Sequence, residues 1–131
     1  AGAILLGQPG KTEFLPLLEK LTDDDEDQVR LKAAESVGRV GEAGAIAPLR
    51  RASKDPTPSV REAVAQSLGE VQGEGSIELL EGLAGDDDFR VRLAAFSSLA
   101  RFGEKGRQVI GNHWGDNRRL AREAIYESYQ E

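Results

Sequence analysis

A pattern of 31 residues repeats along this chain and constrains the fold more than any other feature. The segments 29–38, 60–69 and 91–100 align without gaps at this spacing, and each begins with Val-Arg. Apolar residues stand at positions i, i+4, i+5 and i+8 of each segment, which is one stripe of an α-helix. We therefore expect a two-helix unit in each repeat, with these segments as the second (B) helices.

A shorter apolar segment precedes each B helix. Residues 14–21, 46–52 and 77–83 are the expected first (A) helices, with Leu18, Leu49 and Leu80 in equivalent places. The glycine-rich stretches 38–44 and 69–75 then join one B helix to the next A helix. Glycine adopts the left-handed conformation that ends helices, so we interpret these stretches as interhelical connectors.

The two ends of the chain carry incomplete repeats. Residues 106–131 fit a fourth unit at a spacing of 30, with Ile110 where Leu80 was, and residues 1–7 match the second half of a B helix. Terminal repeats are commonly atypical. We predict one domain over residues 1–131, divided into a half repeat 1–10, repeats at about 11–41, 42–72 and 73–103, and a degenerate terminal repeat 104–131.

These features resemble HEAT repeats, particularly the phycobilisome-lyase HEAT-like type, in which an Asp precedes the Arg of Val-Arg by six residues. The matching pairs are Asp24/Arg30, Asp55/Arg61, Asp86/Arg92 and Asp116/Arg122. The resemblance implies an all-α, right-handed α-solenoid, an ARM/HEAT-like alpha–alpha superhelix of about four two-helix repeats with a truncated first repeat. It also implies that the Asp and Arg residues form a structural ladder of charge-assisted hydrogen bonds between neighbouring units.

The amino-acid composition excludes several kinds of functional site. The chain has no cysteine, which excludes disulfides and cysteine-ligated zinc, and its single histidine, His113, excludes a two-histidine metal site. By resemblance, the same count excludes the iron-binding HEAT enzyme deoxyhypusine hydroxylase. No stretch approaches the roughly 20 apolar residues of a membrane span. We expect a soluble segment of a longer protein that does not insert into a membrane, with its compartment unknown and the cytoplasm favoured.

Two kinds of segment resemble known ligand-binding motifs. The segment Gly7–Thr12 looks like the end of a phosphate-binding loop, but the required glycine five residues before Gly10 is Leu5. The acidic runs 23–27 and 86–88 lack the spacing of a calcium-binding EF-hand loop, and we interpret them as solvated turns that favour the following helix N-termini. His113 with Trp114 is either an aromatic contact patch or a cap on the core. We predict no catalytic residue, metal site or cofactor.

Our first functional hypothesis is a non-enzymatic scaffold that binds another protein. A subunit of a bilin lyase-like enzyme is the alternative. Nucleic-acid binding is a third hypothesis, disfavoured because the net charge is −6; only the cluster of Arg118, Arg119 and Arg122 supports it. Residues 1–89 carry 9 Lys and Arg against 18 Asp and Glu, so electrostatic steering favours a basic partner over most of the surface.

Helical angles locate the expected binding face. Residues 29, 33, 34 and 37 span about 140° of the first B helix, so the free face lies at about 200° to 300°. It should form the concave surface of the stack. Its residues are Gln28, Leu31, Lys32, Glu35 and Arg39, then Ser59, Glu62, Ala63, Gln66 and Glu70, then Arg90, Leu93, Ala94, Ser97 and Arg101. Leu31 and Leu93 are candidate contact anchors, or they merely shield aliphatic neighbours.

The N-terminal half repeat predicts an exposed apolar end. Ile4, Leu5 and Leu6 belong to a B helix without its A helix. Solenoid ends normally carry a polar cap. We therefore expect this end to be covered by upstream sequence or by self-association.

Overall fold

The computed structural model describes residues 12–41, 43–113, 115 and 117–128, and these residues form helices and no strand. Two short 3-10 helices, η1 (Thr12–Phe14) and η2 (Ala43–Ala45), lead into the first two A helices. The A helices are α2 (Leu15–Leu21), α4 (Ile46–Ala52), α6 (Ser76–Leu83) and α8 (Gly103–Asn112). The B helices are α3 (Asp27–Val40), α5 (Pro58–Val71), α7 (Phe89–Ala100) and α9 (Arg118–Ser128).

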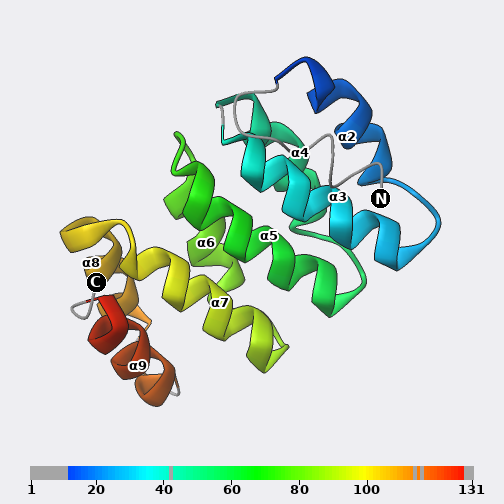
Figure 1. The fold of residues 1–131 in the computed structure, drawn as a ribbon. Helices are drawn as coiled ribbons and strands as arrows, with labels where there is room; N and C mark the ends of the chain where they lie inside the picture. Colours follow the sequence, from blue (N-terminus) through cyan, green and yellow to red (C-terminus); the bar gives the residue numbers. More distant parts are fainter. Residues whose placement is uncertain (1–11, 42, 114, 116, 129–131) are drawn as a thin grey trace.

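The helices stack in two layers. Helices α3, α5 and α7 run side by side in one layer, and α4 and α6 lie behind them (Figure 1). Each B helix packs on the A helix before it, on the A helix after it where one follows, and on the neighbouring B helices. The chain is an α-solenoid, as the repeat predicts.

The core repeats with the sequence. Leu18, Leu49, Leu80 and Ile110 each bury their side chains completely, one from every A helix. The B helices contribute Val37, Leu68 and Leu99 at the same spacing of 31, and these side chains are also fully buried. Because every repeat supplies the same positions, one continuous core runs along the stack, which is how solenoids bury apolar surface.

The interpretation of Gly38 and Gly69 as connector residues is wrong. Both lie inside helices, Gly38 in α3 and Gly69 in α5, and both are buried. A Cβ added to Gly38 would lie 2.9 Å from the Cα of Ser67, and the next B helix therefore needs a glycine at this point. The chain leaves α3 three residues later, at Gly41, which has a left-handed φ of 71°.

Buried serine hydroxyls form hydrogen bonds between B helices where these helices pack closely. Ser67 Oγ donates to the carbonyl oxygen of Ala34 at 2.8 Å, and Ser98 Oγ donates to that of Ala65 at 2.7 Å. Ser67 and Ser98 are 31 residues apart and almost fully buried. Their hydroxyls therefore join α5 to α3 and α7 to α5.

Several sequence predictions fall outside the described residues. These are the half repeat 1–10 with its apolar residues Ile4, Leu5 and Leu6, most of the loop-like segment Gly7–Thr12, Trp114 and Asp116. Among the described helices, none is long and apolar enough to cross a membrane.

Candidate partner-binding surface

The predicted rows lie on three adjacent B helices, which Figure 1 shows side by side. We call this surface the B-helix face. Its exposed members are Gln28, Lys32 and Arg39 on α3, Gln66 and Glu70 on α5, Arg90 on α7, and Arg101 at the C-cap of α7. Glu35, Ser59, Glu62 and Ser97 are half-buried. A polar, solvent-accessible surface therefore extends across three repeats.

Ala63 and Ala94 do not belong to this surface. They are only 3% and 7% exposed and form part of the core, which corrects the predicted rows. Both stand at the position of Lys32, one helical turn before Ser67 and Ser98, whose hydroxyls contact the preceding B helix. A lysine side chain is long enough to reach solvent from that position, whereas an alanine methyl group is covered.

The two candidate anchors are partly covered. Leu31 and Leu93 are half-buried, and both pack against the core from its edge. Part of each side chain already contributes to folding, so a substitution there changes stability as well as the surface. Their role as contact anchors stays a prediction.

Charge alternates across the B-helix face. On α3, Glu35 Oε2 lies 3.8 Å from both Lys32 Nζ and Arg39 Nη2. The central helix α5 presents the acids Glu62 and Glu70, while α7 and its C-cap present Arg90 and Arg101. An acidic strip is thus flanked by two strips that contain basic residues, and a partner must match that order to bind without like-charge contacts.

A ladder of arginine and aspartate runs along the turns between the A and B helices. Arg30 Nε donates to Asp55 Oδ2 at 2.8 Å, and its Nη1 donates to the carbonyl oxygen of Asp24 at 2.8 Å. Arg61 repeats both contacts, with Asp86 Oδ2 at 2.8 Å and the Asp55 carbonyl oxygen at 2.7 Å. Each of these arginines therefore contacts the backbone of its own repeat and the carboxylate of the next.

The remaining arginines of the ladder are Arg92 and Arg122. Arg92 Nη1 donates to the carbonyl oxygens of Asp86 and Asp87 at 2.8 and 3.0 Å. Its Nε is buried and has no acceptor among the described residues, and Asp116, the next carboxylate in the series, lies outside them. Arg122 is exposed on α9.

The contacts in the ladder shift the pKa values of three of its side chains. Burial alone would raise the pKa of Asp86, but hydrogen bonds from Arg61 and from the backbone N–H of Asp88, with the charge of Arg61, lower it on balance. The carboxylate partners raise the pKa of Arg30 and Arg61 against the opposing effect of burial. These groups stay charged at neutral pH, which suits ion pairing instead of proton transfer.

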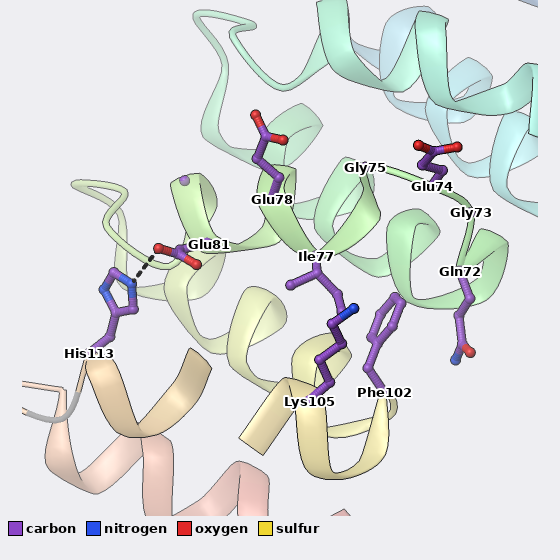
Figure 2. Close-up of a pocket in the computed structure, with 11 residues that line it drawn as sticks. Gln72, Gly73, Glu74, Gly75, Ile77, Glu78, Glu81, Phe102, Lys105 and His113 are labelled. Carbon is purple, nitrogen blue, oxygen red and sulfur yellow. Dashed lines mark ion pairs between the residues drawn. The ribbon is translucent and has the colours of Figure 1, made fainter. Parts of the chain in front are cut away.

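An open groove of about 870 Å³ lies on the other layer, between α6 and α8 (Figure 2). Ile77 and Phe102 contribute apolar surface, and Lys105 extends beside them. At one end, His113 Nε2 lies 3.6 Å from Glu81 Oε1, and His113 forms the C-cap of α8. We call this the A-layer groove.

Sequence reasoning missed the A-layer groove. Across it the repeat is kept, because Glu81 and His113 stand 62 residues after Glu19 and Arg51, the pair that joins α2 to α4, and Gly82 stands 31 residues after Arg51. Arg51 Nη2 crosses from α4 to Glu19 of α2 at 2.6 Å, whereas Gly82 leaves the matching position of α6 without a side chain. A Cβ at Gly82 would meet nothing within 4 Å.

Among the described residues, no cluster of three or more His, Cys, Asp or Glu is arranged to hold a metal ion. The acidic turns instead satisfy backbone groups: Asp24 Oδ1 accepts from the N–H of Glu26 at 2.9 Å, and Asp88 Oδ1 accepts from the N–H of Arg90 at 2.8 Å. The second contact caps the N-terminus of α7.

Comparison with known families agrees with the helical stack. A family model of HEAT repeats matches residues 14–100 and again residues 51–129. The chain belongs to the HEAT-repeat family. No curated protein matches it. The HEAT match thus covers both layers and the B-helix face.

Proposed function

We propose that this HEAT-repeat chain is a non-enzymatic scaffold or adaptor that binds another protein on its B-helix face. The observation that carries the proposal is the row of Arg39, Glu70 and Arg101, which stand 31 residues apart in three successive repeats and are all exposed. HEAT repeats are generally protein-interaction scaffolds. Stacked repeats provide such extended surfaces because equivalent positions line up from one unit to the next.

The charge pattern favours a protein partner over a nucleic acid. A phosphate backbone is uniformly negative and would meet Glu62 and Glu70 on the central helix. A protein surface can instead place basic groups over α5 and acidic groups over Arg90 and Arg101. Such matching of opposite charges speeds association and excludes wrong partners.

Charge reversal tests the proposal. The double variant Arg90→Glu with Arg101→Glu changes two exposed residues at the α7 edge of the B-helix face. Proteins that bind the unaltered chain are recovered, and each one is purified and titrated against the variant. We expect the affinity of the partner to fall by at least about tenfold, because like charges replace complementary ones.

The matched control is Lys20→Glu with Lys54→Glu, which makes the same change in charge at two exposed residues of α2 and of the turn after α4. This control should retain the partner with its original affinity. A partner that binds the α7 variant as tightly as the unaltered protein, or that is lost equally from the control, overturns the proposed face.

We further propose that the repeats are of the phycobilisome-lyase HEAT-like type. The support is the spacing of six residues between Asp55 and Arg61, in which Arg61 Nη1 returns to the Asp55 carbonyl oxygen at 2.7 Å. Arg30 makes the equivalent contact with Asp24. The repeated spacing therefore has a structural role in the described repeats.

A further inference from the structure

The first B helix, α3, has a neighbouring B helix on only one side among the described residues. Figure 1 shows α5 between α3 and α7, and α3 makes its main contacts with α5, α2, α4 and η2. Ala34 and Gly38 are the residues of α3 that meet Ser67 of α5. The opposite side of α3 is therefore the side that a preceding B helix would occupy in a longer stack.

Ser36 lies on that opposite side. It stands two residues from both Ala34 and Gly38, which places it about 160° away from them around the helix. We call the side of α3 that carries Ser36 its outer side. Ser36 also stands 31 residues before Ser67 and 62 before Ser98, so it occupies the position from which α5 and α7 contact the helix before them.

The hydroxyl of Ser36 is buried without an acceptor. Ser36 is 0% exposed, and its Oγ has no hydrogen-bond partner among the described residues. The equivalent hydroxyls of Ser67 and Ser98 donate to backbone carbonyl oxygens at 2.8 and 2.7 Å. Native proteins rarely leave a buried hydroxyl unsatisfied, because this costs free energy. The outer side of α3 therefore lacks an acceptor that both interior contacts possess.

The position of that acceptor can be counted along the chain. Each interior serine donates to a carbonyl oxygen 33 residues earlier, which belongs to Ala34 in one case and to Ala65 in the other. The residue 33 before Ser36 is Ala3, a third alanine. Ala3 lies outside the described residues. The chain itself thus supplies an acceptor of the same residue type at the same separation.

A glycine also stands where the close approach of two B helices needs one. A Cβ added to Gly69 would lie 2.7 Å from Ser98 Oγ, and one added to Gly38 meets its serine in the same way. The residue 31 before Gly38 is Gly7. At that position a larger side chain would collide with Ser36, whereas glycine admits it.

Two further positions keep the register of the end of a B helix. Leu6 stands 31 residues before Val37, which is fully buried in the core. Gly10 stands 31 residues before Gly41, whose left-handed φ of 71° ends α3. Together with the alanine and the glycine described above, four positions of one short segment match the last turns of α3.

A second copy of this chain fits the outer side of α3 less well. Stacked end to end, it would offer its last B helix, α9. At the spacing of 30 found in the terminal repeat, the residue equivalent to Gly69 and Ala100 is Gln130. A glutamine side chain is too large where a single Cβ already meets the serine. The segment 3–10 is therefore the favoured occupant.

We propose that residues 3–10 form the last two turns of a preceding B helix and pack on the outer side of α3. Ser36 Oγ donates to the carbonyl oxygen of Ala3, Gly7 lies against Ser36, and Leu6 enters the core. A helix of this length is unstable alone, so its packing on α3 holds it in place. The chain thereby covers one end of its own core, whether or not a partner is bound to the B-helix face.

Single cysteines test the packing directly, because the chain has no cysteine of its own. Leu6→Cys places a thiol at the position expected to face the core. Gln8→Cys is the matched control, since Arg39, 31 residues later, is exposed. We expect Leu6→Cys to react with iodoacetamide at least about tenfold more slowly than Gln8→Cys, because the segment must open first. Equal rates for the two thiols overturn the proposal.

A larger residue at position 36 should release the segment. In the chain that carries Leu6→Cys, Ser36→Leu fills the space that Gly7 leaves, and the thiol should then react within about twofold of the rate of Gln8→Cys. Arg39→Leu changes an exposed residue of the same helix and should leave the slow rate unaltered. Slow reaction that survives Ser36→Leu places the segment elsewhere, and the proposal is then wrong.

Ser36→Ala adds a measurement that stays informative if Ser36→Leu does not fold. Loss of a hydrogen bond to Ala3 should lower the melting temperature by about 2–5 °C. Removal of a hydroxyl that has no acceptor would leave the melting temperature unchanged or raise it, and either result refutes the proposed contact. All rates and melts are measured at two protein concentrations about a hundredfold apart. Protection of Leu6→Cys only at the higher concentration indicates a second copy on α3, which also overturns the proposal.

Discussion

The carboxylate of Asp86 joins two repeats. Its Oδ2 accepts from Arg61 Nε at 2.8 Å, and its Oδ1 accepts from Arg61 Nη2 at 3.1 Å and from the N–H of Asp88 at 2.9 Å. The side chain of Asp86 is 11% exposed, so these hydrogen bonds lie largely out of water. Charge-assisted bonds of this kind are stronger than those between neutral groups.

Asp86→Asn should therefore destabilise the fold at neutral pH. Loss of the charged acceptor leaves Arg61 without its carboxylate, and we expect the free energy of unfolding to fall by about 1–3 kcal/mol. The check is chemical denaturation at pH 7. Asp87→Asn, which changes an exposed side chain of the same turn, is the control and should have little effect.

The effect of Asp86→Asn should also depend on pH. The pKa of Asp86 in the folded protein lies below its ordinary value of about 3.8, so its stabilisation is present above that value and is lost as the pH falls through the folded-state pKa. Melting curves should show the variant converging on the unaltered protein in acid. A difference in stability that stays constant from pH 7 to pH 2 would contradict this linkage.

At this scale the sequence predicts which residues are equivalent but not which atoms meet. The separation of six residues between Asp55 and Arg61 is visible in the chain. The partner of the Arg61 side chain, however, is Asp86, 25 residues further on, and the contact within the repeat uses the Asp55 backbone. Both facts depend on how adjacent repeats turn relative to each other, which local spacing does not encode.

Helix boundaries follow the repeat closely, with one informative exception. The predicted segment 46–52 coincides with α4, and α6 begins one residue before the predicted 77–83. Glycine composition misplaced the ends of α3 and α5, because Gly38 and Gly69 serve helix packing. Composition cannot distinguish a glycine that ends a helix from one that admits a neighbouring serine.

Gly38→Ala should destabilise the contact between α3 and α5. The added Cβ would lie 2.9 Å from the Cα of Ser67. Because Cα is a backbone atom, it can move away only if α5 shifts as well. Overpacking of this kind typically costs about 1–3 kcal/mol. Gly82→Ala is the matched control, since its Cβ meets nothing within 4 Å, and it should stabilise α6 by about 0.5–1 kcal/mol. Thermal melts of both variants check the prediction, which an unchanged melt for Gly38→Ala would refute.

For the whole molecule, periodicity in the chain was enough to predict the solenoid, since residues 31 apart fall on equivalent helix positions and must share one core. The same periodicity also predicted which residues of the B helices share the B-helix face. Periodicity could not predict the A-layer groove, because Glu81 and His113 keep the repeat there and the spacing of residues does not report how far α6 and α8 stand apart. Nor could it predict that Ala63 and Ala94 are buried, because their accessibility depends on the packing of adjacent B helices.

Site-specific photo-crosslinking tests the central proposal, partner binding on the B-helix face, most directly. Gln66, exposed at the middle of α5, is replaced in cells by the photoreactive amino acid benzoylphenylalanine, and Ala47, exposed on α4, is replaced in a matched variant. The proposal predicts a covalent adduct between the partner protein and position 66, with none at position 47. An adduct formed only from position 47, or equally from both, would contradict it.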